Sequence, residues 1–438
     1  MNSAPPKKKV SILRRVYAEL RFSGESLRIN ARAMLFALAV GLLVGVCGGT
    51  FSRLLSLADT LRDSAVWVEL LLPLAGLLVV WMYRRGGIKT AGGTDLIVQA
   101  ARGEQPVSRL LAPVIFLSTL LTHAFGGSAG REGAALQLGG SLAELVRKGV
   151  RMGDEFSDLA IMTGMSAGFS AVFGSPISAA IFALEISCVG ILPLGALFPC
   201  VIASITAGTV SKALGAHAVH FILALSPPGV LFYGRVLLLA MACGLLSILV
   251  CYTFSGVRAA LEEWIPNPYL RVLVGGSVVV VLSLLLGQHY LGSGQNLVQD
   301  AIVDGRCHGL DFLLKLLFTA LTLGAGLKGG EIVPSFAIGA TFGCLLGPVL
   351  GLPPQHAAAI GMIALFCAVT NCPLTALLLA VEVFSFAGAG GFLLAVAASF
   401  LVSGYGGLYS KQKFAFAKNA DATGTLHHAS DHRPPNAP

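Results

Sequence analysis

The stretch Gly126-Gly127-Ser128-Ala129-Gly130-Arg131-Glu132-Gly133 places an ionisable acid in a glycine-rich turn directly after a long apolar run. An acid inside a membrane is costly, and such residues mark ion pathways and proton relays. Glu132 is therefore the first candidate functional residue of this chain. Its interpretation depends on whether the surrounding sequence spans a membrane.

The composition is that of a polytopic membrane protein. The chain has 438 residues, of which 55% are hydrophobic and 12% charged. Its fifty-three glycines and twenty prolines cut the apolar runs into pieces, which predicts broken helices buried in protein. The runs are continuous rather than alternating, so a membrane β-barrel is excluded and the predicted fold class is all-α. Runs that reach the ~20 residues of a span are Ala33–Ser52, Leu110–Gly130, Leu159–Leu184, Ile186–Ser211, Val236–Val257, Val272–Val298, Ile332–Val381 and Val383–Ser410.

The charge distribution predicts the topology. Eight lysines and arginines precede the first run, against the two acids Glu19 and Glu25. The positive-inside rule therefore puts the N-terminus in the cytoplasm, and this basic stretch is too long for the n-region of a cleavable signal. We interpret the net charge of +8 as topology and lipid contact, because no aromatic-interleaved basic patch indicates nucleic acid.

Cysteine and histidine give no sign of a metal or cofactor site. The nine cysteines are scattered without paired metal-type spacing, and seven of them lie in apolar surroundings, which is typical of small core residues in a reducing cell. His427, His428 and His432 lie in a polar tail that contains proline, where disorder is the better interpretation. We therefore predict no metal and no cofactor.

The two halves of the chain contain an internal repeat. Phe169–Glu185 runs parallel to Phe366–Glu382, so that a proline and a glutamate match in each half. Upstream, Gly130–Gly139 matches Gly330–Gly339, which makes the two glycine-rich turns counterparts. Duplicated membrane proteins commonly hold their substrate at the repeat interface, where discontinuous helices end. The predicted parts are a basic cytoplasmic segment (1–32), a first membrane repeat (33–215), a second (216–411) and a short disordered cytoplasmic tail (412–438).

The glycine turns have the chemistry of an anion site. A helix that starts after such a turn directs unpaired N–H groups and the positive end of its dipole at whatever lies in front of it. Two such ends, one from each repeat, would bind a small anion without a fixed basic side chain. Ionised Glu132 can occupy the anion position itself and leave it when protonated, which would exchange protons for anions. The alternative is that Arg131 and Glu132 only pair at a helix end, but adjacent helical residues do not face each other.

Gly130-Arg131-Glu132-Gly133 resembles the central signature of the CLC family of anion channels and anion/proton antiporters. Support comes from Gly330-Glu331-Ile332-Val333-Pro334 and from Leu408-Tyr409-Ser410. The resemblance extends from about Ala33 to Lys411 and implies an inverted-repeat helical bundle, a homodimer and one ion pathway in each subunit. It implies that Glu132 is the gating, proton-linked acid. The implied anion-binding residues are Gly92, Gly93, Thr94, Gly130, Arg131, Gly133, Gly330, Ile332 and Tyr409.

Two positions depart from the family pattern. The first-half loop reads Ala91–Asp95 where many members have Gly-Ser-Gly-Ile-Pro, so the serine ligand is absent and Thr94 is the nearest substitute. Ile186 stands where chloride antiporters have an inner proton-feeding glutamate. Glu331 resembles an acid of the fluoride/proton antiporter branch and is a second proton-linked candidate, although it could also pair with Lys328 at a helix end.

The sequence leaves several functions open. The interpretation we favour is exchange of a small halide for protons in the cell membrane, with chloride as the family default and fluoride as the alternative. A passive chloride channel and an organic-anion transporter remain alternatives; the latter should line the midplane with arginines or aromatic residues. Gly126–Gly130 also fits G-x-S-x-G literally, with His123 as a base, but a hydrolase needs a strand-turn-helix elbow. We therefore predict a transporter and no enzyme.

Overall fold

The computed structural model describes residues 12–88, 93–216, 220–222 and 229–418. The predicted anion-binding Gly92 and the histidines of the tail lie outside these residues. The described residues form sixteen α-helices and one pair of short strands. The helices are α1 (Ile12–Ser64), α2 (Leu72–Arg85), α3 (Gly93–Ala100), α4 (Leu111–Ala124), α5 (Glu132–Gly149), α6 (Ser157–Phe173), α7 (Pro176–Glu185), α8 (Leu197–Ala213), α9 (Val230–Trp264), α10 (Pro268–Leu286), α11 (Gln295–Gln299), α12 (Asp311–Ala325), α13 (Ile332–Val349), α14 (Pro354–Thr370), α15 (Pro373–Phe384) and α16 (Ala389–Val402).

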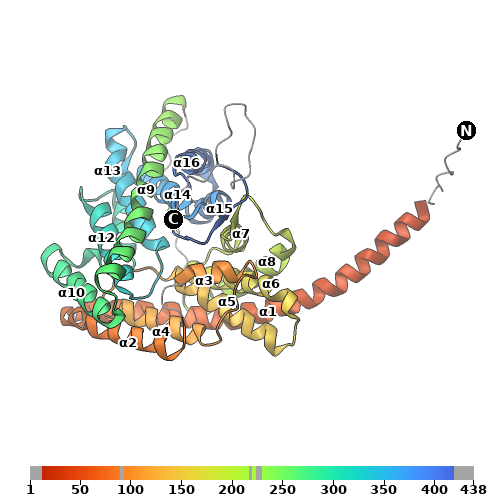
Figure 1. Cartoon of the computed structure of the whole chain (residues 1–438). Coiled ribbons are helices and arrows are strands. Elements are labelled where there is room, and N and C mark those ends of the chain that lie inside the picture. Colours follow the sequence, from red (N-terminus) through yellow and green to blue (C-terminus); the bar gives the residue numbers. More distant parts are fainter. Residues whose placement is uncertain (1–11, 89–92, 217–219, 223–228, 419–438) are drawn as a thin grey trace, which may run out of the picture.

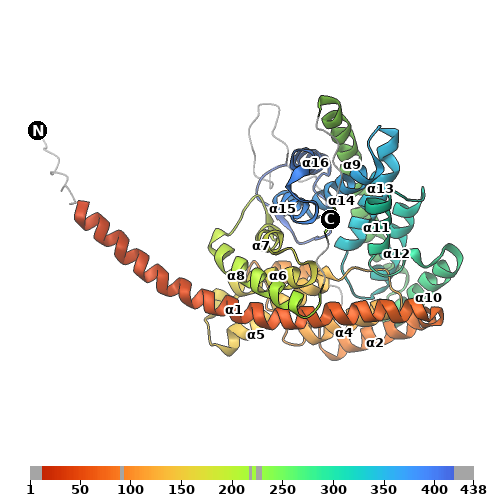
Figure 2. The ribbon, with the colours of Figure 1, turned by 180° about the vertical axis from the view of Figure 1, so that it is seen from behind.

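The helices divide into two adjoining groups that follow the predicted repeats. The first group, α1 to α8, and the second, α9 to α16, lie side by side in both views of the ribbon (Figures 1 and 2). Within the described residues, seven helical segments are long and apolar enough to cross a membrane, and five further apolar helices are shorter. The prediction of a helical membrane protein with broken helices is confirmed.

Counterpart helices in the two groups begin and end alike. Helices α5 and α13 both have 18 residues, and α6 and α14 both have 17. Both α7 and α15 carry proline at the first helical position, where its missing N–H leaves no intrahelical bond unmade. The residues that close α6 and α14, Gly174 and Asn371, are both left-handed, with φ of 71° and 56°. Because these residues end one helix and begin the next, the apolar runs of the two groups are interrupted at matching positions.

Small residues let the helices behind the glycine turns approach closely. Helix α5 packs on α6, and α13 packs on α14 in the same way. A side chain at Gly139 would collide with the backbone of Gly164, and one at Gly339 with the backbone of Gly361. Small residues at such crossings are how membrane helices pack when no hydrophobic force drives them together.

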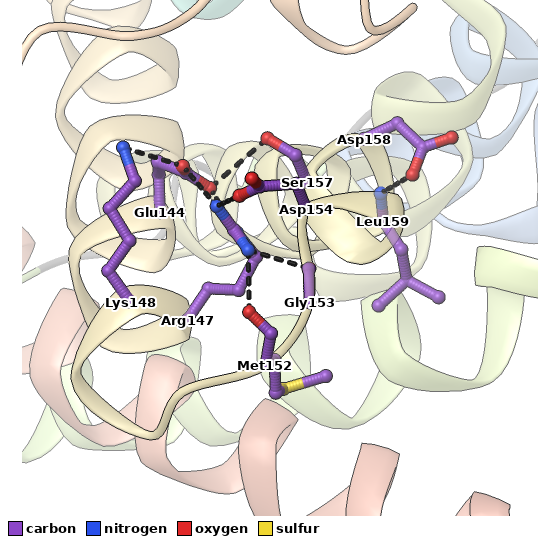
Figure 3. Close-up of polar contacts among 9 residues, drawn as sticks. All are labelled: Glu144, Arg147, Lys148, Met152, Gly153, Asp154, Ser157, Asp158 and Leu159. Carbon is purple, nitrogen blue, oxygen red and sulfur yellow. Dashed lines mark hydrogen bonds and ion pairs between the residues drawn. The ribbon is translucent and has the colours of Figure 1, made fainter.

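A buried arginine fixes the turn between α5 and α6. Arg147 binds the Glu144 carboxylate through two nitrogens, at 2.7 and 2.8 Å, and Asp154 through a third contact of 2.8 Å (Figure 3). Its remaining nitrogen donates to the carbonyl oxygens of Met152 and Gly153. Bidentate pairing of this kind is geometrically specific, so the far end of α5 is held in one orientation.

The first residues of the predicted disordered tail are folded. Strand β2 (Lys413–Phe414) pairs in parallel with β1 (Cys188–Val189), and the amine of Lys418 donates to the Asn371 side chain. Residues 412–418 therefore belong to the folded body, contrary to the expectation of a disordered tail from residue 412. Backbone pairing with a distant segment is the reason, and composition alone does not reveal it.

The other predicted boundaries stay predictions. Helix α1 runs without interruption from Ile12 across the expected boundary between residues 1–32 and the first repeat. The expected boundary between repeats falls at residues 215–216, in the connection between α8 and α9 that is only partly described.

Candidate anion and proton site

The two glycine turns meet at the centre of the molecule. The amide of Gly130 donates to the carbonyl of Gly330, and the amide of Gly330 donates back to that of Gly130, both at 2.7 Å. This antiparallel bridge joins the turn before α5 to the turn before α13. The helix start predicted for each repeat therefore lies beside that of the other.

The carboxylate of Glu132 lies at the start of the opposite repeat. Its Oε1 accepts hydrogen bonds from the amides of Ile332 and Val333, at 2.5 and 3.0 Å. The side chain is fully buried, and Oε2 has no hydrogen-bond partner among the described residues. The acid of the first repeat thus occupies the N-terminus of α13, the place where a helix attracts an anion.

Glycine is required on both sides of this carboxylate. A side chain at Gly130 or at Gly330 would collide with the Glu132 carboxylate itself. A Cβ at Gly133 would lie 2.8 Å from the Thr94 hydroxyl oxygen, which places Thr94 beside the turn. The structure therefore brings five of the predicted anion-binding residues together with Glu132: Thr94, Gly130, Gly133, Gly330 and Ile332.

Tyr409 is buried, and the residue after it contacts the first-repeat loop. The Tyr409 side chain is 5% exposed and belongs to the main hydrophobic core. The next residue, Ser410, donates its hydroxyl to Asp95 at 2.6 Å, and Asp95 follows Thr94 in the first turn of α3. Tyr409 is therefore held close to the first-repeat loop, although its ring makes no polar contact with Glu132 among the described residues, and its role at the anion site stays a prediction.

Glu331 and Arg131 line different cavities. The Glu331 cavity has a volume of about 70 Å³ and is lined by Gly93, Thr94, Lys328 and Glu331. A charged cluster on α9 and α10 completes its wall and consists of Arg258, Glu262 and Arg271. The ammonium of Lys328 lies over the Tyr83 ring, 4.7 Å from its centroid. Glu331 and Lys328 thus share one cavity wall, and the alternative roles of Glu331 stay predictions.

Arg131, the chain neighbour of Glu132, does not line the cavity that Glu331 lines. It lines a cavity of about 600 Å³ with Ser52, Asp59 and Gln295. Among the residues that the structure describes, no ion pair joins Arg131 to Glu132. The arrangement disfavours simple pairing of Arg131 with Glu132 at the helix end, and the predicted anion-binding role of Arg131 stays a prediction.

Ser128 and His123 do not form a catalytic pair. The Ser128 hydroxyl accepts from the Lys315 amine at 2.9 Å and lies 2.9 Å from the Thr319 hydroxyl. His123 instead places Nε2 3.2 Å from the carbonyl of Gly130. The turn follows helix α4 rather than a strand, so the elbow that a hydrolase would need does not form.

Lys315 is a residue of this region that the sequence did not single out. It is fully buried in α12, and its amine donates to Ser128 and to the carbonyls of Tyr290 and Gly292, at 2.8 to 3.0 Å. A lone lysine in an apolar helix gives little warning of such a role. The sequence predicted an anion site without a fixed basic side chain. This expectation is incomplete, because the buried Lys315 amine donates to Ser128 in the turn before Glu132.

Paired helix starts inside the membrane, one of them occupied by a buried acid, define an ion-transport protein. The sequence profile of the voltage-gated chloride channels matches residues 75–404. A chloride/fluoride channel protein of Pseudomonas syringae pv. tomato is 34% identical over 399 residues, covering 89% of this chain and 88% of the relative. The chain belongs to the voltage-gated chloride channel (CLC) family, as its motifs predicted, and members of this family are transport proteins rather than enzymes.

Solved structures agree with this assignment. The crystal structure of a CLC-type fluoride/proton antiporter shares 30% identity with a TM-score of 0.84, covering 88% of this chain and 98% of the other. The structure of a slow cyanobacterial Cl⁻/H⁺ antiporter shares 21% identity with a TM-score of 0.76, covering 85% and 94%, and this similarity supports the fold. The predicted CLC-type helical bundle is confirmed.

Proposed function

We propose that this chain exchanges a small halide for protons across the membrane, with fluoride as the halide and Glu132 as the proton-linked gate. One observation carries the proposal: the Glu132 carboxylate accepts hydrogen bonds from Ile332 and Val333 at the start of α13. An acid that occupies an anion site competes with the anion for it.

The exchange follows from that competition. Ionised Glu132 satisfies the amides of α13 and closes the pathway. When the carboxyl is protonated it loses its negative charge, and the dipole and amides of α13 favour an incoming anion instead. Gly130 and Gly330 leave room for the carboxylate to enter and leave. Each passage of an anion is thereby linked to a proton on Glu132.

Fluoride is supported over chloride by similarity and by the anion loop. The relative at 34% identity is named a chloride/fluoride channel protein, and the structure at 30% identity is a fluoride/proton antiporter. The chloride antiporter structure is more distant, at 21% identity. The loop also lacks the serine that many members have at the aligned position, and Thr94 is the nearest hydroxyl. Chloride, the family default, is the alternative.

We propose Glu331 as the second proton-linked acid. Ile186, at the usual position of the inner acid, is buried and has no ionisable group. Glu331 precedes Ile332, whose amide binds Glu132, and it lines the cavity that reaches the charged cluster on α9 and α10. A proton on Glu331 would therefore start next to the gate.

Topology and assembly complete the proposal. The basic N-terminal residues support a cytoplasmic N-terminus, and the C-terminal segment would then lie on the same side. The family resemblance supports a homodimer in the lipid bilayer. Since Glu132, Gly330 and Thr94 all come from one chain, each subunit would hold a complete pathway.

The experiment is ion exchange by the purified protein in liposomes. An outward fluoride gradient should drive proton uptake against a proton gradient, and a fluoride electrode compared with a chloride electrode gives the selectivity. Glu132→Gln keeps the size of the side chain but removes its titration, so it should keep anion movement and abolish proton coupling. The exposed Glu263→Gln serves as the control. Anion flux without proton movement in the wild type would instead identify a channel, and coupling that survives in Glu132→Gln would refute this role of Glu132.

A further inference from the structure

The segment that carries Tyr409 is tied to both halves of the molecule. Towards the second repeat, the amide of Leu408 donates to the carbonyl of Val369 at 2.8 Å, and the Gln412 side chain donates to the carbonyl of Thr370 at 3.0 Å. These contacts lie at the end of α14. They fix the segment to one body of the fold.

Towards the first repeat, hydrogen bonds between this segment and α3 converge on one side chain, that of Asp95. Asp95 accepts the Ser410 hydroxyl through Oδ2 at 2.6 Å and the Lys411 amide through Oδ1 at 3.3 Å. These bonds join residues more than 300 positions apart. Ser410 and Lys411 immediately follow Tyr409, so a shift of either residue moves the ring.

Helix α3 is itself firmly held. Ile97 and Val98 are fully buried, and α3 packs on α5, the helix that begins with Glu132. Asp95 therefore connects the Tyr409 segment to the body that carries the gate. Asp95 stands where the family pattern has proline, which has no side-chain acceptor, so a proline at this position could not accept the hydrogen bonds of Ser410 and Lys411.

The bond between Asp95 and Ser410 lies at the surface. Ser410 is exposed and Asp95 half-buried, whereas the contacts with α14 are buried. A hydrogen bond that competes with water contributes little to overall stability. It can nevertheless open and close without unfolding, which suits a contact that must yield when an anion passes Tyr409.

We propose that Asp95 is the positioning residue of Tyr409, which the family resemblance assigns to the anion site: the Asp95 carboxylate holds Ser410 and Lys411, and so keeps the Tyr409 ring across the anion pathway. This inference rests on the proposed function, since it assumes that Tyr409 borders the pathway. The first-repeat loop thereby contributes a latch on the Tyr409 segment in addition to Thr94.

Liposome exchange with single and double variants tests the latch. Asp95→Ala and Ser410→Ala should each raise anion flux that moves without protons, by about threefold to tenfold, as expected for loss of one ordinary hydrogen bond in competition with water. The double variant should show no more than the larger single effect, because both changes break the same contact. In a Tyr409→Ala background the Asp95 change should add nothing, which separates positioning of the gate from a general structural effect.

Two variants sharpen the readout. Asp95→Asn keeps an acceptor for Ser410 but presents an amide to the Lys411 N–H, so it should fall between wild type and Asp95→Ala. Asp158→Ala is the matched control, because Asp158 is likewise an aspartate in the first turn of a helix but bonds its neighbouring amide of Leu159 (Figure 3). It should leave flux and coupling unchanged.

The outcomes separate this inference from the proposed function. Wild-type coupling and flux in both Asp95→Ala and Ser410→Ala would overturn the latch while leaving the antiporter intact. A wild type that moves no protons would overturn the antiporter, and the latch would then stand or fall on anion flux in the same variants. If Asp95→Ala does not elute as a folded protein, Ser410→Ala carries the test, since it removes one exposed hydroxyl.

Discussion

Glu185 and Glu382 cap each other's helices. The carboxylate of Glu185, at the end of α7, accepts the amides of Leu374 and Thr375 at the start of α15, at 3.0 and 2.8 Å. Glu382, near the end of α15, accepts the amides of Ile177 and Ser178 at the start of α7, at 2.9 and 2.8 Å. Each acid satisfies orphan donors of the other helix and complements its dipole. The two short helices are thereby locked in opposite directions, as an inverted repeat requires.

Removing either capping carboxyl group should lower the free energy of unfolding, and the loss should be larger for Glu185 than for Glu382. Glu185→Gln and Glu382→Gln each replace a carboxyl group that accepts from two amides and a hydroxyl by a carboxamide whose NH₂ faces a donor, so each should destabilise the protein by about 1.5–3 kcal/mol. Glu185 should cost more, because it is 4% exposed whereas Glu382 is half-buried. Thermal unfolding in detergent measures the effect against the exposed Glu263→Gln. Equal melting temperatures in all three variants would contradict the capping role.

The repeat was readable from the sequence, but its contacts were not. The matched prolines and glutamates predicted that α7 and α15 are counterparts. They did not predict that each glutamate binds the other helix, because an internal repeat does not specify which helix ends meet. A signal was present: Ser178 and Thr375 stand at matching places after the prolines, and each hydroxyl donates to the same acid as its amide, at 2.6 Å.

The site was predictable where backbone geometry decides it. Glycine turns before helices locate amide-lined anion sites, so the turns at Gly130 and Gly330 followed from the sequence pattern, whereas Ile332 followed only from the family resemblance. The contributions of Val333 and Lys315 did not, since an apolar residue that acts through its amide carries no side-chain signal. A single buried lysine is likewise uninformative until the carbonyls around it are known.

Gly330→Ala should displace the gate. The new methyl group would meet the Glu132 carboxylate and the Gly133 amide, and the backbone there is fixed by the bridge to Gly130. The carboxylate is the part that can move, so it should leave the amides of α13 and open the site. We expect anion efflux from liposomes that proton gradients no longer control. Gly309→Ala, whose Cβ would enter open space, should behave as wild type, and a tightly coupled Gly330→Ala would show that the carboxylate does not need this room.

Glu331→Gln should separate proton movement from anion movement. The amide preserves the size of the cavity wall next to Ile332 but carries no proton, so proton uptake should fall at least tenfold while fluoride efflux continues. Glu262→Gln changes another acid that lines the same cavity, one already paired with Arg258, and should retain coupling. The ratio of protons to anions is the measurement, and equal loss of coupling in both variants would assign the effect to the cavity as a whole instead of to Glu331.

Lys315→Met tests the buried ammonium that binds Ser128 in the turn before Glu132. Methionine fills a similar volume but donates nothing, so Ser128 and the carbonyls of Tyr290 and Gly292 lose a shared donor in a place closed to water. Removing the charge also relieves its desolvation, which opposes the loss. The unsatisfied carbonyls should dominate, because each buried acceptor left unpaired costs about 1–3 kcal/mol. We expect a lower unfolding temperature and slower exchange, with the exposed Lys212→Met unchanged. A more stable Lys315→Met protein would show that the ammonium is retained for transport, since burial of the charge would then exceed the worth of its hydrogen bonds.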